Sequence, residues 1–207
     1  MQWTVLVPVK ALPAAKSRLS GFSADAAAHA RLVDAIRGDT LGAARAAAGV
    51  TRVVRIGDAQ GVEHELLQQR PGLNAALAEG ARHAAAQWPG DGVAALVGDL
   101  PALTAVELAA ALTAAAEHPT AFVADADGTG TTLLTATPPA TLEPRFGPGS
   151  AARHGADAAA LVGGAGLRQD VDTPDDLRAA LLLGVGPRTL AVLAARQTSV
   201  VHRYEAS

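Results

Sequence analysis

Three cationic side chains stand close together near the start of the chain. Lys10 and Lys16 are six residues apart and Arg18 follows, just after the apolar run from Val5 to Val9. Only 18% of the residues are Asp, Glu, Lys or Arg, so the cluster requires an explanation. Lysine and arginine hold phosphate groups, arginine through two parallel N–H donors. The cluster therefore indicates either a solvated loop or an anion site for a polyphosphate.

Three carboxylates follow other predicted strands. Asp99 comes after the apolar run 93–97, and Asp170 and Asp172 are separated by one residue. In an extended segment that spacing places both side chains on the same side, where like charges repel unless a cation or a proton compensates them. Mg²⁺, which takes oxygen ligands and often a phosphate, is a natural partner. Simpler interpretations remain open: Asp172 as a helix cap beside a solvated Asp170, and Asp99 as a turn residue.

Two glycine-containing segments could also hold an anion. Residues 128–132 offer backbone N–H groups and hydroxyls, but the pattern is equally typical of a hairpin turn. Residues 146–150 read FGPGS and precede an expected helix, so Ser150 is either an N-cap or part of an anion seat. The six histidines show no ligand spacing, and we predict that all of them are surface or incidental residues. No serine lies in the nucleophile-elbow setting of Ser/His/Asp hydrolases.

The composition limits the class of protein. A chain of 207 residues, 49% of them apolar, suits one domain with a sizeable core. The absence of cysteine excludes disulfides and thiolate chemistry. A net charge of −3 argues against a nucleic-acid partner. Neither a secretory signal nor an apolar run of membrane-spanning length is evident, so we expect a cytoplasmic protein with no membrane partner.

Apolar runs alternate with alanine-rich stretches, and this alternation predicts the elements that must position the polar side chains. The expected strands cover residues 5–9, 51–56, 93–97, 121–124, 131–136 and 166–171. The expected helices cover residues 24–48, 73–87 and 104–117, and two more begin near residues 150 and 173. One interpretation of the first helix has a break near Gly38. We expect one domain over residues 1–196 and a frayed tail over 197–207.

Two of these helices carry start signals. Thr104 and Glu107 have the spacing of a capping box, and Thr173 precedes a proline at the first helical position. Alternating strands and helices predict a mainly parallel sheet with helices on both faces. Ligands bind such sheets at the carboxyl ends of the strands. The cations and the carboxylates follow predicted strands, so one cleft could collect them.

Six short motifs, taken in order, carry a resemblance to a known family. They are VPVKALPAAKSRL at 7–19, GLN at 72–74, GDLP at 98–101, GTGT at 128–131, FGPGS at 146–150 and DVDTP at 170–174. From about residue 3 to 195 the chain resembles the phosphoenolpyruvate/2-phospho-L-lactate guanylyltransferases of coenzyme F-420 biosynthesis. It is shorter than that family between Asp58 and Gly72, so the third strand is expected to be curtailed. Its first loop also lacks the glycine-rich form found in sugar-nucleotide and molybdopterin nucleotidyltransferases, which favours the F-420 branch.

The resemblance implies a fold and a reaction. The fold would be a single Rossmann-like α/β domain of the nucleotidyltransferase, glycosyltransferase-A-like type, with a mainly parallel mixed sheet flanked by helices. The donor would be GTP, the cofactor Mg²⁺ and the favoured acceptor phosphoenolpyruvate, with the product passed to a downstream transferase. Alternatives are 2-phospho-L-lactate or 3-phosphoglycerate as acceptor, and a non-catalytic Mg²⁺-dependent nucleotide-binding module.

The same resemblance implies residue roles. The nucleotide would be held by Lys10, Lys16, Arg18 and Asn74, the metal by Asp99, Asp170 and Asp172, and the acid by Thr131, Gly147 and Ser150. Lys16 and Asp99 would carry catalysis. The acceptor phosphate is already a nucleophile and needs no general base, so positioning and charge stabilisation would supply most of the rate.

Overall fold

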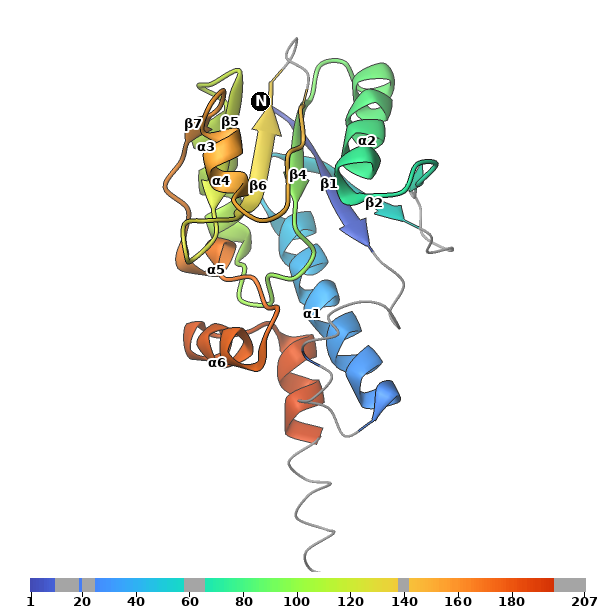
Figure 1. Ribbon diagram of the computed structural model, residues 1–207, viewed down its shortest axis with the longest axis vertical. Coiled ribbons are helices and arrows are strands. Elements are labelled where there is room, and N and C mark those ends of the chain that lie inside the picture. Colours follow the sequence, from blue (N-terminus) through green and yellow to red (C-terminus); the bar gives the residue numbers. More distant parts are fainter. Residues whose placement is uncertain (10–18, 20–24, 58–65, 138–141, 196–207) are drawn as a thin grey trace, which may run out of the picture.

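The computed structural model describes residues 1–9, 19, 25–57, 66–137 and 142–195, and these form a sheet with helices on both faces (Figure 1). The predicted cations Lys10, Lys16 and Arg18 lie outside the described residues, as does the predicted tail over 197–207.

A mixed sheet of seven strands forms the centre of the described structure. The strands are β1 (Trp3–Val9), β2 (Val50–Gly57), β3 (Leu66–Leu67), β4 (Gly92–Leu96), β5 (Thr120–Ala124), β6 (Thr131–Ala136) and β7 (Ala159–Ala160). They are ordered β3-β2-β1-β4-β6-β5-β7, and only β6 runs antiparallel to its two neighbours. The prediction of a mainly parallel mixed sheet is therefore confirmed, and the two-residue β3 agrees with the expected shortening.

Helices cover both faces of this sheet. They are α1 (Ala26–Ala46), α2 (Leu73–Gln87), α3 (Ala105–Ala115), α4 (Ser150–His154), α5 (Ala165–Arg168) and α6 (Pro174–Leu183). A last, unlabelled helix covers Pro187–Ala195. Side chains of α1 and α3 pack on one face of the sheet, and those of α2 and α4 pack on the other.

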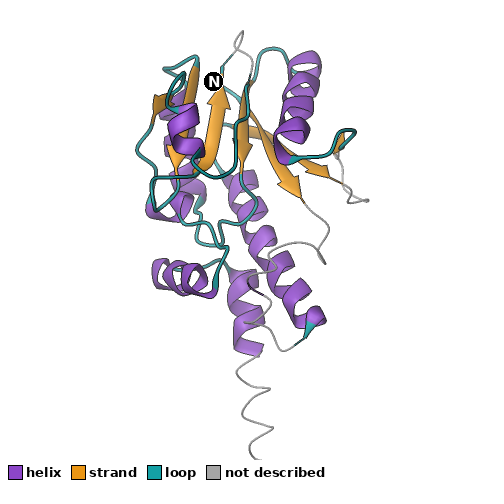
Figure 2. Cartoon of the chain, viewed as in Figure 1, coloured by secondary structure: helices purple, strands orange, loops and turns teal. Residues whose placement is uncertain are grey.

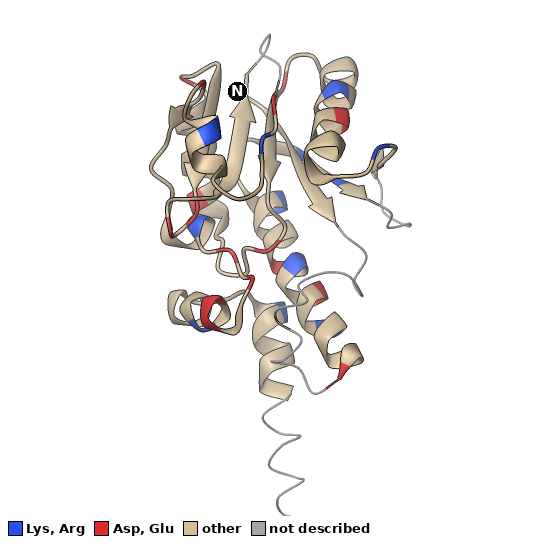
Figure 3. Cartoon of the chain, viewed as in Figure 1, with Lys and Arg blue, Asp and Glu red and all other residues tan. Residues whose placement is uncertain are grey.

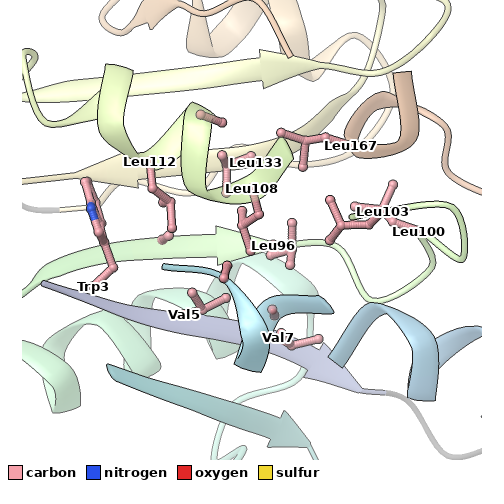
Figure 4. Close-up of a cluster of buried hydrophobic side chains, with 14 of the residues drawn as sticks. Trp3, Val5, Val7, Leu96, Leu100, Leu103, Leu108, Leu112, Leu133 and Leu167 are labelled. Carbon is pink, nitrogen blue, oxygen red and sulfur yellow. The ribbon is translucent and has the colours of Figure 1, made fainter. Parts of the chain in front are cut away.

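The buried strand β1 divides its side chains between these two faces. Val5 and Val7 join the cluster that includes Leu108 of α3 (Figure 4). Leu6, between them, packs instead with Leu77 of α2. Alternation of this kind is what an extended chain buried on both faces requires, and each buried aliphatic side chain contributes about 1.5–3 kcal/mol. Both clusters hold β1 rigidly up to Val9, immediately before the predicted cationic loop.

The amino-terminal half of α1 extends beyond the sheet and supports a third cluster (Figure 2). There Leu32 and Ile36 of α1 pack with Leu177 of α6 and with Val171. Val171 lies between Asp170 and Asp172, two of the three predicted metal ligands, so this cluster anchors the segment that carries them.

The first helix is continuous through Gly38, and the interpretation with a break there is wrong. A Cβ atom at Gly38 would lie 2.6 Å from Cδ of Arg188, in the last helix. The glycine therefore serves close packing of two helices rather than a change of chain direction.

The predicted strand over 166–171 is also wrong, because residues 165–168 form the short helix α5. The N–H of Gly166 donates to Oε1 of Glu107 at 2.8 Å, and a Cβ at Gly166 would lie 2.2 Å from the carbonyl oxygen of Ala102. The sheet position next to β5 is occupied by β7. Contacts with other elements, rather than local preference, therefore decide the conformation here.

The predicted helix starts at Thr104 and Thr173 are confirmed. Thr104 and Glu107 form a reciprocal capping box at α3, and Thr173 forms one with Asp176 at α6, where Pro174 is the first helical residue. Among the described residues no single helix is long and apolar enough to cross a membrane, although the bent pair Pro174–Leu183 and Pro187–Ala195 reaches that length and composition jointly.

Candidate active site

The two predicted acidic segments, Asp99 and residues 170–172, lie side by side at the end of the sheet where β1 and β4 end. The N–H of Val171 donates to the carbonyl oxygen of Asp99 at 3.1 Å, which places residues 170–172 beside the loop that follows β4. Figure 3 shows acidic segments gathered between the sheet and α6. The loop is fixed from the other side, because the N–H of Leu100 donates to the buried hydroxyl of Thr40 in α1 at 2.9 Å.

Burial alternates along the second segment. Val171 is fully buried, whereas Asp170 is half-buried and Asp172 is exposed. The side chains flanking a buried residue in an extended segment point away from the core. Asp99 is half-buried as well. The interpretation of Asp172 as the cap of α6 is wrong, because Thr173 occupies that position.

The donor chemistry of these segments suits Mg²⁺. Within the described part of the chain, no group of three or more His, Cys, Asp or Glu residues is arranged to hold a metal by itself. Mg²⁺ is, however, usually bound through one or two carboxylates together with water and substrate phosphates. The two adjacent acidic segments fit that mode of binding, in which a polyphosphate completes the ligand set.

The three residues predicted to seat an acid come together through α4. The N–H of Ser150 donates to the carbonyl oxygen of Gly147 at 3.0 Å, and the N–H of Ala151 donates to that of Thr129 at 3.0 Å. One helical turn later, Nδ1 of His154 lies 2.9 Å from Oγ1 of Thr131. The start of β6, residues 145–149 (the glycine-rich loop) and α4 therefore form one unit.

Ser150 is the first residue of α4 and is buried, but it is not the N-cap. The N-cap is Gly149, in a left-handed conformation with φ +71°. Gly147 also has a positive φ, +120°. Residues that carry a Cβ atom rarely adopt these backbone conformations, which explains the two glycines in FGPGS.

The carbonyl groups of the glycine-rich loop are held by Arg153. Its guanidinium donates to the carbonyl oxygens of Arg145, Gly147 and Pro148, at 2.8, 3.2 and 2.6 Å. In the described part of the chain, no hydrogen bond uses the N–H of Gly147 or Gly149. The loop thus has its acceptors occupied while two of its donors remain available, an arrangement that suits an anionic ligand.

Asn74 fixes the same loop from the start of α2. Its Nδ2 donates to the carbonyl oxygen of Phe146 at 3.1 Å, and its Oδ1 accepts from the N–H of Phe146 at 2.8 Å. The predicted contact between Asn74 and a nucleotide stays a prediction, and it requires an amide that already has two partners.

His154 departs from the expectation that all histidines are surface or incidental residues. It is 3% exposed, and His29 is also buried. Burial, followed by the nearby cations of Arg145 and Arg153, lowers the pKa of His154 from its ordinary value of 6.5 to about 4. The spacing offered one signal: His154 lies four residues after Ser150, on the same face of the predicted helix.

Arg168 is a second residue that the sequence analysis did not identify. Its guanidinium donates to the carbonyl oxygens of Ala124, Asp125 and Ala126, with a shortest contact of 2.7 Å. The Asp125 carboxylate in turn accepts from the turn N–H groups at 129 and 130, at 2.9 and 2.7 Å. The hairpin turn is therefore tied to the segment that leads into Asp170.

A pocket of about 380 Å³ borders His154 on the face of the sheet that α4 covers. It is lined by Thr120, Leu134, Thr135, Leu142, Glu143, Arg145, His154, Asp157 and Ala158. None of the predicted site residues that the structure describes lines this pocket. We therefore place the candidate active site at the acidic segments and the glycine-rich loop.

Comparison with known proteins identifies close relatives. A protein of Streptomyces scabiei named phosphoenolpyruvate guanylyltransferase is 50% identical, with 94% of this chain and 97% of the relative covered. A protein of the same name from Geodermatophilus obscurus is 49% identical, covering 95% of this chain and 97% of the relative. No family model matches the chain.

A solved structure supports the fold independently. A protein from Desulfovibrio desulfuricans G20, provisionally described as a nucleotide-diphospho-sugar transferase, superposes with a TM-score of 0.71. It covers 99% of each chain at 18% identity. The expected nucleotidyltransferase-type α/β fold is thereby confirmed.

Proposed function

Because the chain belongs to the phosphoenolpyruvate guanylyltransferase family, we propose that it transfers GMP from GTP to the phosphate of phosphoenolpyruvate. The products are enolpyruvyl-diphospho-guanosine and pyrophosphate. The observation that carries the proposal is the identity of about half of the residues with relatives of that name over nearly the whole chain. We place the reaction in coenzyme F-420 biosynthesis, in the cytoplasm, with the product passed to a downstream transferase.

The reaction is a substitution at the α-phosphorus of GTP. An oxygen of the acceptor phosphate forms the new P–O bond, and the bond to pyrophosphate breaks. The acceptor phosphate is already ionised, so no side chain has to remove a proton. Negative charge grows on the leaving pyrophosphate, and its stabilisation supplies most of the rate enhancement. By residue type, Lys16, Arg18 and Lys10 suit the triphosphate.

The carboxylates of Asp99, Asp170 and Asp172 would hold Mg²⁺. The ion supplies charge neutralisation to the reacting phosphates when it is bound. Adjacent placement of the two acidic segments supports this assignment, since one ion contacting both would fix them relative to the nucleotide.

The acceptor acid would bind at the glycine-rich loop. Gly147 and Gly149 offer N–H donors there, Arg153 holds the loop carbonyls, and Thr131 and Ser150 provide hydroxyls. A small anion with a carboxylate and a phosphate matches a site built mainly of donors.

The test is turnover with defined substrates. Purified protein is incubated with GTP, Mg²⁺ and, separately, phosphoenolpyruvate, 2-phospho-L-lactate and 3-phosphoglycerate, and released pyrophosphate is measured. We expect the fastest release with phosphoenolpyruvate and almost none with ATP as donor. Faster release with either other acid would reassign the acceptor, and no release with any acid would support a non-catalytic nucleotide-binding module.

A further inference from the structure

His154 has a hydrogen-bond partner on each ring nitrogen. Nε2 lies 2.9 Å from the backbone nitrogen of Arg145, and Nδ1 lies 2.9 Å from Oγ1 of Thr131. The ring packs edge-on against Phe146, with centroids 5.2 Å apart, and a tilted Phe122 ring lies 6.2 Å away. The imidazole is therefore fixed in position and orientation between the glycine-rich loop and the start of β6.

These partners determine where the imidazole carries its proton. With a pKa lowered to about 4 by burial and by two nearby arginines, the ring is neutral at neutral pH and has one N–H. The backbone N–H of Arg145 can only donate, so Nε2 must be the unprotonated nitrogen. The hydrogen-bond network thus assigns the proton to Nδ1, which donates to the Thr131 hydroxyl.

The orientation of the Thr131 hydroxyl follows from this assignment. Its oxygen accepts from Nδ1, so its own hydrogen must point to another acceptor. Thr131 is 6% exposed, and within the described part of the chain its hydroxyl has no hydrogen-bond partner other than His154. A hydroxyl has one donor hydrogen and two acceptor lone pairs; here Nδ1 uses one lone pair, and the hydrogen is left without an acceptor among the described residues.

We infer that His154 is a positioning residue that fixes the Thr131 hydroxyl as a donor toward an oxyanion of the acceptor substrate. The inference rests on the proposed function, since that function places the acid at Thr131. A carboxylate or phosphate oxygen only accepts hydrogen bonds, so it satisfies this buried donor hydrogen. A ligand N–H would have to use the second lone pair of the oxygen and would leave the hydroxyl hydrogen without an acceptor, which is unfavourable in a buried position. The series of hydrogen bonds from the Arg145 N–H through His154 to Thr131 thereby favours an anionic acceptor substrate.

Two substitutions separate the contacts of the ring. In His154→Asn the amide nitrogen lies near the position of Nδ1 and can donate to Thr131. In His154→Gln the amide oxygen lies near the position of Nε2 and can accept from Arg145. Each variant therefore keeps one hydrogen bond and loses the other, while both reduce the ring packing to a similar extent.

Steady-state kinetics in both substrates, beside a melting curve, tests the inference. We expect His154→Gln to raise the KM for phosphoenolpyruvate about tenfold, the loss of one hydrogen bond, and His154→Asn to raise it less than about threefold. The KM for GTP should change less than about twofold in both variants. In a Thr131→Val background, His154→Gln should have almost no further effect, because the two residues act as one unit.

Other outcomes would overturn the inference. If both variants melt earlier with an unchanged phosphoenolpyruvate KM, His154 only stabilises the fold. If His154→Asn is the variant that raises this KM, the imidazole acts through Arg145 and not through Thr131.

The proton position is measurable without turnover. Long-range ¹⁵N–¹H NMR of the wild-type protein distinguishes the two neutral tautomers of His154, and we expect protonated Nδ1. Protonated Nε2 would overturn the inference even if guanylyl transfer is observed. Protonated Nδ1 in a protein that releases no pyrophosphate would leave the hydroxyl orientation intact and refute the proposed function instead.

Discussion

The side-chain amide of Asn74 fixes the glycine-rich loop and is also the group predicted to contact the nucleotide. Both its oxygen and its nitrogen are bonded to the backbone of Phe146, which a nucleotide contact would have to share or replace. A side chain that satisfies both polar groups of one peptide unit is well suited to fixing a loop, because few other partners match that spacing.

Asn74→Ala should therefore disturb the glycine-rich loop more than it weakens the binding of the nucleotide. We expect a loss of about 1–3 kcal/mol in the free energy of unfolding, since two backbone groups lose their partners. The KM for the acceptor acid should rise while that for GTP changes little. Gln87→Ala, at the exposed end of α2, is the control. A raised GTP KM with unaltered acceptor KM would restore the nucleotide contact.

His154 makes stability depend on pH. Its pKa is about 4 when folded and near 6.5 when unfolded, so between these values the unfolded chain binds more protons. Stability is then fully present above about pH 6.5 and falls as the pH is lowered toward 4, by about 3 kcal/mol in total.

Urea unfolding at pH 7 and pH 5 measures this dependence. Wild type should lose about 2 kcal/mol over the interval from this residue, and His154→Phe, which has no titrating group, should lose correspondingly less. Equal pH dependence in wild type and His154→Phe would show that folding does not lower the pKa of His154.

At the scale of elements, local signals were sufficient where an element's own residues determine it. The start of α3 was predicted from the capping box of Thr104 and Glu107, and the start of α6 from the proline that follows Thr173. Each signal lies within four consecutive residues. The segment 166–171 was not predicted correctly, since its conformation depends on Glu107 and Ala102, about sixty residues away. The burial of His154 likewise comes from a fold that encloses it between Arg145 and Thr131, which no local pattern encodes.

Substitution at two glycines should distinguish crowded from open positions. Gly166→Ala places a Cβ 2.2 Å from a backbone oxygen, and we expect a loss of about 1–3 kcal/mol in stability. Gly42→Ala, in α1 with nothing within 4 Å, should gain about 0.5–1 kcal/mol from helix propensity. Chemical denaturation measures the change in the free energy of unfolding for each variant. An unchanged stability of Gly166→Ala would mean that α5 shifts readily to make room for the Cβ atom.

At the scale of the whole molecule, the sheet brings together segments that are far apart in the sequence. The loop after β4 meets residues 170–172, while β6 and α4 present the glycine-rich loop. The class of fold and the location of these segments followed from the alternation of strands and helices. The hairpin turn also indicates that β6 runs antiparallel to β5. The pairing of β6 with β4 and the clamps on the loop could not be predicted, because they depend on residues far apart in the sequence.

Removing the predicted metal ligands should abolish turnover and leave the fold intact. We expect Asp99→Ala, Asp170→Ala and Asp172→Ala each to reduce pyrophosphate release at least about a hundredfold, because charge neutralisation in the transition state is lost. Excess EDTA should have the same effect on wild type. Asp175→Ala, at an exposed carboxylate of α6 paired with Arg178, is the matched control. Near-normal release at saturating Mg²⁺ would remove that residue from the ligand set.

Asp39, in the middle of α1, receives the N–H groups of Arg188 and Thr189 at 3.1 and 2.8 Å. This contact joins residues about 150 positions apart in the sequence. It is therefore among the last contacts that a growing chain can form during synthesis on the ribosome. Until the helix Pro187–Ala195 has been synthesised, the Asp39 carboxylate and the surface at Gly38, against which Arg188 packs, remain exposed to water. A chain that ends before this helix therefore leaves the Asp39 side chain exposed where the full chain buries it. Such a chain folds less completely and is degraded more readily by quality-control proteases.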